Sequence, residues 1–326
     1  MTKLIIQIPC FNEEKSLSIT LANLPRKLSG IDVIEWLIID DGSTDNTTEV
    51  AKENGVDHVI QLIRHQGLAR GFMAGIQACL DNGADIIVNT DADNQYNADD
   101  IPNLIQPILE GKADIVIGAR PISNIKHFST LKKIFQKLGS WMVRKVSHTQ
   151  VDDAPSGFRA ISREAAMHMH VFSDYTYTLE TIIQAGQRGM AVVSVPIKTN
   201  DFLRKSRLIH NIPRYLLMSI NTIIRIFMTY QPLAFFIIPG IILFLCGTIL
   251  GFRFLYFYLF TSSSSGHIQS LILSTVLLIL GGLLVIFGLI ADLVSVNRKL
   301  LENVDYRIKR LDEEIRAIRH TQSKRY

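Results

Sequence analysis

The sequence predicts an α/β domain with a mostly parallel sheet, followed by two membrane-spanning helices. In residues 1–200, apolar runs of strand length alternate with amphipathic stretches of helix length. This alternation is typical of repeated β-α-β units. Residues 232–297 are instead almost continuously apolar. Acidic residues follow several of the apolar runs directly, at the place where open α/β sheets bind their ligands.

The expected elements of the first domain follow from this alternation. We expect strands at residues 3–8, 35–40, 56–63, 85–90, 113–118 and 192–196. We expect helices at residues 15–28, 45–54, 68–82, 98–110 and 131–146. Ser43, Thr44 and Asp45 precede the second helix and are candidate N-caps. The domain boundary is placed near residue 200.

Two later stretches, residues 233–260 and 268–296, are each long enough to cross a bilayer, which takes about 20 helical residues. The alternative is a pair of buried core helices, but so many unbroken apolar positions favour lipid. Arg253 and Asp292 lie toward the ends of these stretches, where charged side chains can reach the interface.

Charges around the two stretches predict the orientation. The Ser-rich linker at residues 261–267 contains no Lys or Arg, whereas the flanking segments are rich in both. The positive-inside rule places the linker outside and both termini in the cytoplasm. The N-terminus begins directly with a strand-like run and shows no signal-peptide pattern. We therefore expect a cytoplasmic catalytic domain on an integral protein of the cytoplasmic membrane.

The segments on either side of the spans have helical periodicity. In residues 201–231, apolar positions recur at intervals of three and four beside several basic residues. This pattern predicts a helix at the membrane surface, with packing on the catalytic domain as the alternative. In residues 298–326, the same spacing links Leu300, Val304, Ile308, Leu311, Ile315 and Ile318. This second pattern indicates a coiled-coil helix and a homo-oligomer.

Composition excludes other classes of protein. The net charge of +4 is too small to indicate nucleic-acid binding. Cys10, Cys79 and Cys246 are far apart and show no metal-ligand spacing. We expect them to be reduced, buried thiols.

The most informative motif follows the strand expected at residues 85–90. Asp91 and Asp93 are one residue apart, and the amide Gln95 comes two residues later. Two carboxylates this close favour a hard divalent cation, Mg²⁺ or Mn²⁺, which in proteins commonly also holds substrate phosphates. The alternative is an ordinary polar loop after a strand.

Several motifs together resemble the family 2 glycosyltransferases, which have the nucleotide-sugar-binding fold called GT-A. The matching residues are Pro9-x-x-Asn12-Glu13, Asp40-Asp41-Gly42-Ser43 and Asp91-Ala92-Asp93-x-Gln95. A further motif, Asp153-x-x-Ser156-Gly157-Phe158-Arg159, resembles the signature of the polyprenyl-phosphate sugar transferases. With two C-terminal spans, the chain is similar to bactoprenol glucosyltransferases, and dolichol-phosphate mannosyltransferases are related.

The resemblance implies roles for individual residues. The nucleotide sugar would be bound by Pro9, Phe11, Glu13, Asp41, His65 and Asp91. The metal would be held by Asp91, Asp93 and Gln95. The acceptor phosphate would be bound by Arg120, Ser156, Arg159, Arg204, Ser206 and Arg207. Asp91, Asp93, Asp153 and Arg120 would act in catalysis, with Asp153 orienting the acceptor or an arginine and not assigned as an obligate base.

Three positions depart from the family pattern. Arg207 replaces the usual Lys, Arg204 stands where Gly is common, and His65 stands where Asn is frequent. The two arginines keep or add positive charge, so phosphate binding remains the expectation. His65 is interpreted as a neighbour of the nucleotide pocket and not as a general base.

The implied activity is inverting, metal-dependent transfer of a sugar from a nucleoside diphosphate sugar to a polyprenyl phosphate, such as undecaprenyl phosphate. UDP-glucose is favoured as the donor, with GDP-mannose or another UDP-sugar as alternatives. A processive polysaccharide synthase and an inactive membrane scaffold are the other hypotheses. Neither Trp36 nor Trp141 lies in the Gln-x-x-Arg-Trp motif that such synthases carry.

Overall fold

The computed structural model describes residues 1–121, 140–171, 177–200, 221–260 and 268–323, apart from residues 142, 222, 223 and 226. The chain divides into two units. One comprises Met1–Leu216 together with Asp305–Tyr326, and the other comprises Leu217–Val304. Each unit is described by itself.

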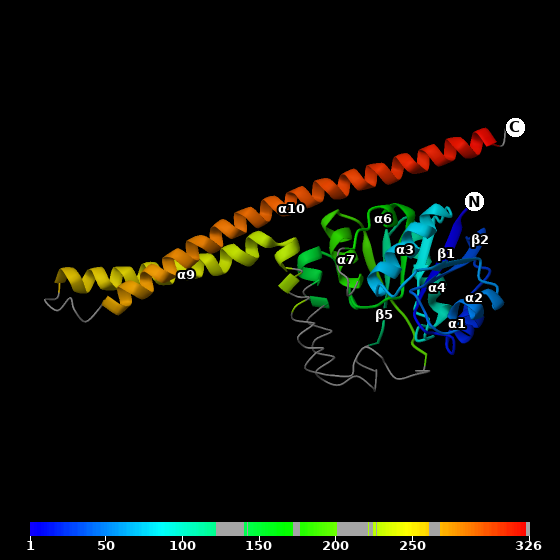
Figure 1. Cartoon of the computed structure of the whole chain (residues 1–326), viewed down its shortest axis with the longest axis horizontal. Coiled ribbons are helices and arrows are strands. Elements are labelled where there is room, and N and C mark those ends of the chain that lie inside the picture. Colours follow the sequence, from blue (N-terminus) through cyan, green and yellow to red (C-terminus); the bar gives the residue numbers. More distant parts are fainter. Residues whose placement is uncertain are drawn as a thin grey trace. The chain divides into compact units, whose positions relative to one another are not determined.

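A seven-stranded sheet forms the centre of the first unit (Figure 1). Its strands are β1 (Lys3–Cys10), β2 (Val33–Asp40), β3 (His58–Gln61), β4 (Ile86–Asn89), β5 (Ile115–Ala119), β6 (Arg159–Ser162) and β7 (Val192–Pro196). They lie in the order β3-β2-β1-β4-β6-β5-β7. All pairings are parallel except those of β6, which runs antiparallel to both β4 and β5.

Helices cover both faces of the sheet, as expected for a sheet of buried parallel strands. They are α1 (Leu17–Asn23), α2 (Thr47–Glu53), α3 (Leu68–Asp81), the 3₁₀ turn η1 (Ala98–Asp100), α4 (Ile101–Leu109), α6 (Arg163–Met167) and α7 (Thr178–Gln187). Helices α1, α2 and α4 contribute to one apolar core. Helix α3 packs on the opposite face, against β1 and β2.

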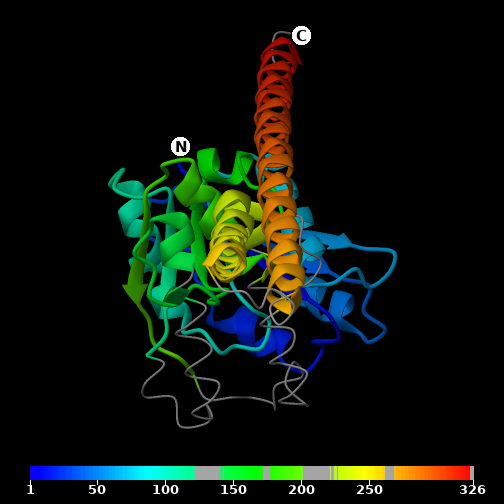
Figure 2. The same cartoon turned by 90° about the vertical axis from the view of Figure 1, so that its left-hand side faces the viewer.

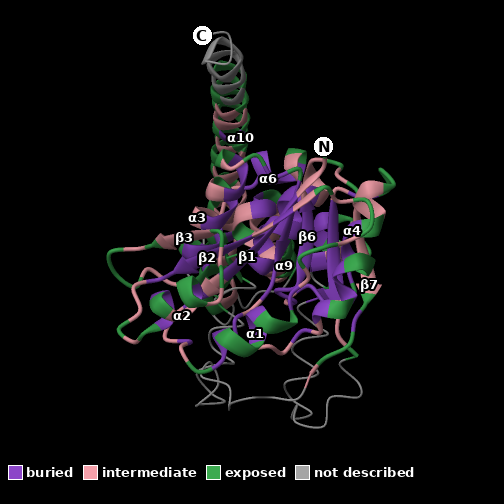
Figure 3. Cartoon of the chain, turned by 90° about the vertical axis from the view of Figure 1, so that its right-hand side faces the viewer, coloured by how far each residue is buried: buried purple, intermediate pink, exposed green. Residues whose placement is uncertain are grey.

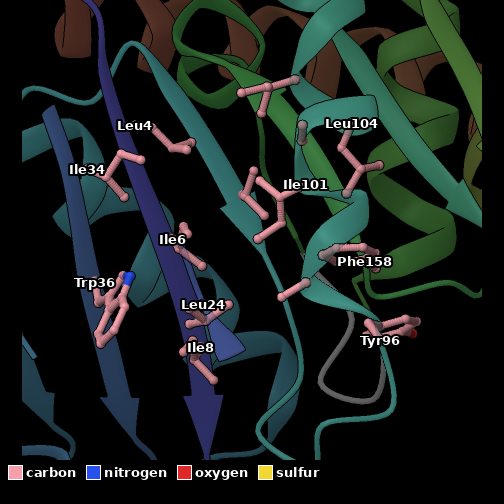
Figure 4. Close-up of a cluster of buried hydrophobic side chains, with 14 of the residues drawn as sticks. Leu4, Ile6, Ile8, Leu24, Ile34, Trp36, Tyr96, Ile101, Leu104 and Phe158 are labelled. Carbon is pink, nitrogen blue, oxygen red and sulfur yellow. The ribbon is translucent and has the colours of Figure 1, made fainter. Parts of the chain in front are cut away.

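The apolar core follows from the alternation of side chains along the strands. Leu4, Ile6 and Ile8 of β1 point to one face, where they join Ile101 and Leu104 of α4 (Figure 4). These side chains are fully buried. Figure 3 shows β1 and β6 as mostly buried, whereas the edge strands β3 and β7 are only partly buried. The core therefore fixes β1, β2 and β4 side by side, and with them the loops that follow these strands.

The second unit contains a helical hairpin formed by α9 (Pro232–Phe260) and the first part of α10 (Ile268–Ser323). Both helices are long and apolar enough to cross a membrane. They lie side by side (Figures 1 and 2), with glycines at the closest contacts. A Cβ added to Gly281 would lie 2.7 Å from the carbonyl oxygen of Gly240. Ser274 Oγ also donates a hydrogen bond of 2.7 Å to the carbonyl oxygen of Gly247. Small residues thus allow the two backbones to approach closely.

The expected elements agree with the structure in type and order, but the structure also contains helices α6 and α7, which were not expected, and differs in three further respects. The sequence interpretation did not include β6, because its four residues contain an arginine and no clear alternation. Helix α10 continues without interruption from the second apolar stretch into the segment expected as a separate C-terminal helix. Cys10 and Cys79 are buried as expected, but Cys246 is exposed on α9. The proposed outside turn at residues 261–267 and most of the expected helix at 131–146 lie outside the described residues.

Candidate active site

The functional loops meet at one edge of the sheet. Strands β2, β1 and β4 are adjacent and parallel, so the segments that follow them leave the sheet on the same side. β5 runs parallel to β4 because both are antiparallel to β6, which brings Arg120 to this edge. The loop containing Asp153 and Gly157 enters the antiparallel β6 from the same edge. β1 is also the point where the strand order reverses, which is where ligands bind in such sheets.

Asp91 and Asp93 follow β4 at this edge and form an acidic pair. Burial, and then the negative charge of Asp93, raise the pKa of Asp91 to about 7, although Arg120 and Arg159 act in the opposite direction. Gln95 belongs to the same turn, because its Nε2 donates to Asp93 Oδ2 at 2.7 Å. The chain thus places two carboxylates and an amide where negative charge is unfavourable without a counter-ion.

This set of donors fits a divalent cation. Carboxylate and amide oxygens are the ligands that Mg²⁺ and Mn²⁺ prefer. Across the described parts of the chain, no cluster of three or more His, Cys, Asp or Glu side chains could hold a metal. A metal at this edge would therefore use the two aspartates, with Gln95 as the candidate third ligand, and share its remaining positions with substrate oxygens or water.

Gly157 lies directly against the carboxylate of Asp91. A Cβ at position 157 would lie 3.1 Å from Asp91 Oδ1 and 3.2 Å from the hydroxyl oxygen of Tyr177. The Gly157 N–H donates to the hydroxyl oxygen of Tyr96 at 3.0 Å. The glycine of the Ser-Gly-Phe-Arg motif therefore avoids an unusually tight contact with the carboxylate of Asp91.

Arg120 and Asp153 form the second charged feature of the site. Arg120 Nε donates to Asp153 Oδ2 at 2.6 Å, and Arg120 Nη2 donates to Asp153 Oδ1 at 3.1 Å. The side chain of Asp153 is 1% exposed and that of Arg120 is 15% exposed. Burial alone lowers the pKa of Arg120, but Tyr96, Asp153 and Asp91 together raise it above its ordinary value. Arg120 is therefore a permanent cation, and Asp153 holds it in place.

A third group of residues lies at the end of β2. Asp41 is buried, and its carboxylate accepts hydrogen bonds from the backbone N–H groups of Gln66 and Gly67 at 2.7 and 2.8 Å. His65 Nδ1 lies 2.8 Å from Asp41 Oδ2, and the His65 ring stacks on Phe11 at a centroid distance of 4.0 Å. His65 is half exposed, so a flat aromatic surface remains available beside Asp41.

The other residues near the predicted nucleoside pocket mainly make contacts within the protein. Glu13 is buried, and its carboxylate accepts a hydrogen bond from Ser16 Oγ. Pro9 lies within β1 and is partly exposed. Asp45 accepts a hydrogen bond from the backbone N–H of Thr47, but the N-cap position of α2 is Asn46, so the expectation of an N-cap at residues 43–45 was wrong by one residue.

Arg159 differs from its expected role. Its side chain is fully buried, and the guanidinium donates to Thr181 Oγ1 at 2.8 Å and to the carbonyl oxygens of Ser156 and Thr178. Ser156 is also fully buried. Both residues lie beneath the surface because the antiparallel β6 carries this end of the motif into the interior. We therefore interpret Arg159 as the residue that shapes the 153–157 loop and not as a direct ligand of the acceptor phosphate.

The sequence interpretation missed a buried polar network beneath the site. Gln7 Nε2 donates to Asn89 Oδ1 at 2.9 Å. Asn89 Nδ2 in turn donates to the carbonyl oxygen of Gly157 at 2.8 Å and to the hydroxyl oxygen of Tyr177 at 2.9 Å. The Tyr177 ring stacks on Phe72 at 3.7 Å. The signal was a polar residue inside each of two buried strands, Gln7 in β1 and Asn89 in β4.

Arg204, Ser206 and Arg207 lie outside the described residues. His168 and His170 take part in contacts with the C-terminal part of α10. His170 Nε2 pairs with Asp305, and the His168 ring stacks on Tyr306 at 3.7 Å.

This α/β fold, with an acidic pair at the switch point of a mostly parallel sheet, defines a nucleotide-sugar glycosyltransferase of the GT-A type. The model of the family described as glycosyl transferase family 2 matches residues 5–169, which is about half of the chain. The chain belongs to this family.

Named relatives agree with this assignment, and a solved structure agrees with the fold. The chain is 31% identical over 217 residues to a UDP-N-acetylglucosamine–dolichyl-phosphate N-acetylglucosaminyltransferase of Methanococcus voltae, covering 59% of this chain and 83% of that one. It is 29% identical to an undecaprenyl-phosphate mannosyltransferase of Micrococcus luteus over 201 residues, covering 58% of this chain and 80% of that one. The fold is similar to glucosyl-3-phosphoglycerate synthase of Mycobacterium tuberculosis, crystallised with Mn²⁺ and UDP. That match has a TM-score of 0.55 at 20% identity and covers 69% of this chain and 79% of that one.

Proposed function

We propose that this protein transfers a sugar from a nucleoside diphosphate sugar to a polyprenyl phosphate at the cytoplasmic face of a membrane. The observation that carries the proposal is the pairing of two charged features at one sheet edge. Asp91 and Asp93 supply a cation site for a diphosphate, and Arg120 supplies a fixed positive charge for a second anion. Relatives named for transfer to undecaprenyl and dolichyl phosphate support a lipid phosphate as that second anion.

The donor side of the proposal follows from the geometry at β1, β2 and β4. The nucleobase would stack on the Phe11–His65 pair, near Asp41. The diphosphate would lie toward Asp91 and Asp93. A bound divalent metal would neutralise the charge that develops on the leaving diphosphate.

The acceptor side requires little proton transfer. A phosphate monoester is already anionic near neutral pH, so one of its oxygens can attack the anomeric carbon directly. The bond from that carbon to the diphosphate oxygen breaks as the new bond forms, and the electron pair leaves with the nucleoside diphosphate. In-line attack inverts the anomeric configuration. Both carboxylate oxygens of Asp153 are engaged by Arg120, so we assign Asp153 the task of orienting Arg120 and not that of a general base.

The two apolar helices supply the membrane component of the proposal. Helices α9 and α10 would each cross the bilayer, and the catalytic domain and both termini would lie in the cytoplasm. The absence of Lys and Arg from residues 261–267 supports this orientation. A membrane-anchored site suits a polyprenyl phosphate, because its head group stays at the bilayer surface while its chain remains in lipid.

The proposal also concerns the identity of the sugar that is transferred. The two-span architecture favours UDP-glucose, whereas the relatives described above are named for N-acetylglucosamine and mannose. A donor panel therefore decides between these sugars. Full-length protein in detergent is incubated with undecaprenyl phosphate, Mg²⁺ or Mn²⁺, and radiolabelled UDP-glucose, UDP-N-acetylglucosamine or GDP-mannose.

The expected result is metal-dependent transfer of label from one donor into the lipid extract. Asp93→Asn should abolish it, and Asp99→Asn, an exposed carboxylate outside the site, should not. If metal-dependent donor binding is measured but no donor yields a lipid-linked product, the acceptor assignment is wrong. If Asp93→Asn transfers at the wild-type rate, the metal assignment is wrong.

A further inference from the structure

Helix α10 carries one apolar seam along most of its length. Its positions alternate at intervals of three and four residues, the a and d positions of a heptad repeat. The seam consists of Leu273, Val276, Leu280, Leu283, Phe287, Ile290, Val294, Asn297, Leu301, Val304, Ile308, Leu311 and Ile315. Asn297 is its one polar member. Each apolar side chain of the seam keeps between 44% and 69% of its surface exposed.

The contacts that the chain makes with itself fall on a different face of α10. Within the hairpin, α9 packs against Ser274, Gly281 and Gly288, all at heptad position b. Within the first unit, the contacts come from Asp305, Tyr306 and Lys309, at positions e, f and b. The same side of the helix is thus covered by the chain in both units, and the described residues leave the a and d side uncovered.

The exposure has different meanings along the helix. Lipid covers apolar side chains in a membrane span, so the exposure of the seam residues before Asn297 needs no protein partner. Downstream, charged residues such as Arg307 and Asp312 show that the helix lies in water. Leu301 is 69% exposed there and Leu311 is 56% exposed. Five apolar side chains in register on the aqueous part of a helix indicate a partner.

The spacing and charges of this part specify a second copy of the same helix. A 3-4 apolar repeat fits the side chains of another helix with the same repeat. In a parallel pair, position g of one helix faces the following position e of the other, which places Arg307 opposite Asp312 of the second copy. An antiparallel pair would bring position e against position e, and therefore Asp305 against Asp312. It would also bring position g against position g, and therefore Arg307 against Glu314, so its charge pairs would be mixed in sign. Ile308 at a and Leu311 at d are the combination that favours two parallel strands, whereas Leu301 at a and Val304 at d are not.

We propose that residues 301–315 of α10 pair in parallel with the same segment of a second copy of this chain. The upstream seam would continue the pairing toward the membrane, and Asn297 would fix the register, as a single polar residue does in coiled coils. The pairing is independent of the sugar donor and of the transfer reaction. Its consequence is that at least two catalytic domains are carried side by side on the same face of the membrane.

Disulfide crosslinking in isolated membranes tests the seam. In a Cys246→Ser background, single cysteines are introduced by Leu301→Cys, Ile308→Cys and Leu311→Cys, with Lys299→Cys and Arg310→Cys as matched controls off the seam. Cys10 and Cys79 remain, because both are buried. Mild oxidation should give a covalent dimer of this chain at the three seam positions and at least fivefold less at the two controls. Equal crosslinking at all positions, no dimer, or crosslinking to a different protein would overturn the proposal.

A charge exchange tests the parallel register without altering the apolar seam. Arg307→Asp alone and Asp312→Arg alone each place like charges opposite one another, and the double variant restores opposite charges. We expect the dissociation constant of the detergent-solubilised dimer to rise roughly fivefold in each single variant and to return in the double variant. If the double variant dissociates as readily as the singles, or if the wild-type protein is a monomer, the parallel pairing is wrong.

Discussion

Arg120 donates hydrogen bonds to both carboxylate oxygens of Asp153, from Nε to Oδ2 at 2.6 Å and from Nη2 to Oδ1 at 3.1 Å. The geometry is that of a bidentate pair, which fixes the plane of the guanidinium as well as its position. The Asp153 side chain is almost wholly buried. The pair therefore holds a positive charge at the edge of the sheet. It also connects the end of β5 to the loop that precedes β6.

Removing Asp153 should destabilise the catalytic domain and misplace Arg120. Loss of one partner from a buried ion pair typically costs roughly 3–5 kcal/mol, because the remaining charge is left unpaired. We expect Asp153→Ala to lower the free energy of unfolding of the full-length protein by about this amount. Asp152→Ala, at the exposed neighbouring position, should change it by less than about 0.5 kcal/mol. Denaturant unfolding in detergent checks both values. Equal stability of the two variants would contradict the structural role of the pair.

Asp91→Asn should stabilise the metal-free protein while abolishing activity. Burial and Asp93 raise the pKa of Asp91 to about 7, so the folded state holds a proton that the unfolded state has lost above about pH 4. Stability therefore falls as the pH rises from about 4 to 7, and the cost is fully present at pH 8. The neutral amide avoids this cost. The thermal unfolding midpoint in EDTA at pH 8 should rise in Asp91→Asn.

Asp57 provides a control, because its pKa is shifted in the direction opposite to that of Asp91. Burial raises the pKa of Asp57, but hydrogen bonds from the Trp36 N–H and Arg26 together lower it. Its charged form is therefore favoured in the folded state, and Asp57→Asn should lower the unfolding midpoint at the same pH. If both variants shift the midpoint in the same direction, the electrostatic argument about Asp91 is wrong.

Gly157→Ala should weaken metal binding because the added methyl group would press on Asp91. The new Cβ would lie 3.1 Å from Asp91 Oδ1 and 3.2 Å from the Tyr177 hydroxyl oxygen. Tyr177 is held by its stack on Phe72 and by Asn89, so the carboxylate is the group that must shift. We expect roughly a tenfold loss of Mn²⁺ affinity, as for changes that disturb the support of a metal ligand.

Gly71→Ala is the matched control for this substitution. Its Cβ would meet Ile39 at 3.9 Å, an ordinary contact, and alanine favours the helical conformation of α3. Mn²⁺ titration followed by electron paramagnetic resonance measures both variants. Unchanged affinity in Gly157→Ala, or an equal loss in Gly71→Ala, would remove the argument for close packing beside Asp91.

The sequence was sufficient to place the acidic edge of the sheet because both signals are local. A strand ends where its apolar run ends, so Asp41, Asp91 and Asp93 could be assigned to strand ends from spacing alone. Parallel pairing then brings these ends together without further information. The structure agrees for these three residues. Arg120 was assigned from the family resemblance alone, and the structure places it directly after β5.

The remaining part of the site depends on contacts between distant residues. β6 is antiparallel, and its four residues show no alternation that separates a strand from a loop. Without β6, the burial of Ser156 and Arg159 could not be foreseen, and both were expected at the acceptor. Asn89 forms hydrogen bonds with Gly157, which is 68 positions away in the sequence, and with Tyr177, which is 88 positions away. No local sequence pattern could predict contacts over such separations.

The contact between His168 and Tyr306 predicts a pH-dependent attachment of the C-terminal helix. Burial, and then the positive charge of Arg188, lower the pKa of His168 although Glu164 lies 3.3 Å from its Nε2. The folded state therefore binds fewer protons at His168 than the unfolded state, and stability falls as the pH drops below about 6.5. Asp305 also has a lowered pKa: burial raises it, but hydrogen bonds from His170 and Lys309 outweigh that effect. Its contribution is lost only near pH 4 or below.

The interval between pH 5.5 and 7.5 excludes the titration of Asp305 but includes His168 and Asp91, whose effects on stability have opposite signs. The effect of His168 is therefore measured in an Asp91→Asn background. In that background we expect His168→Phe, which keeps a ring against Tyr306 but cannot be protonated, to show a smaller fall in unfolding midpoint from pH 7.5 to pH 5.5 than the protein with His168. His148→Asn, at an exposed position with a positive φ that asparagine tolerates, should keep the slope of Asp91→Asn alone. Thermal unfolding of the full-length protein across the interval measures all three. An unchanged slope in His168→Phe would show that protonation of His168 does not govern the attachment.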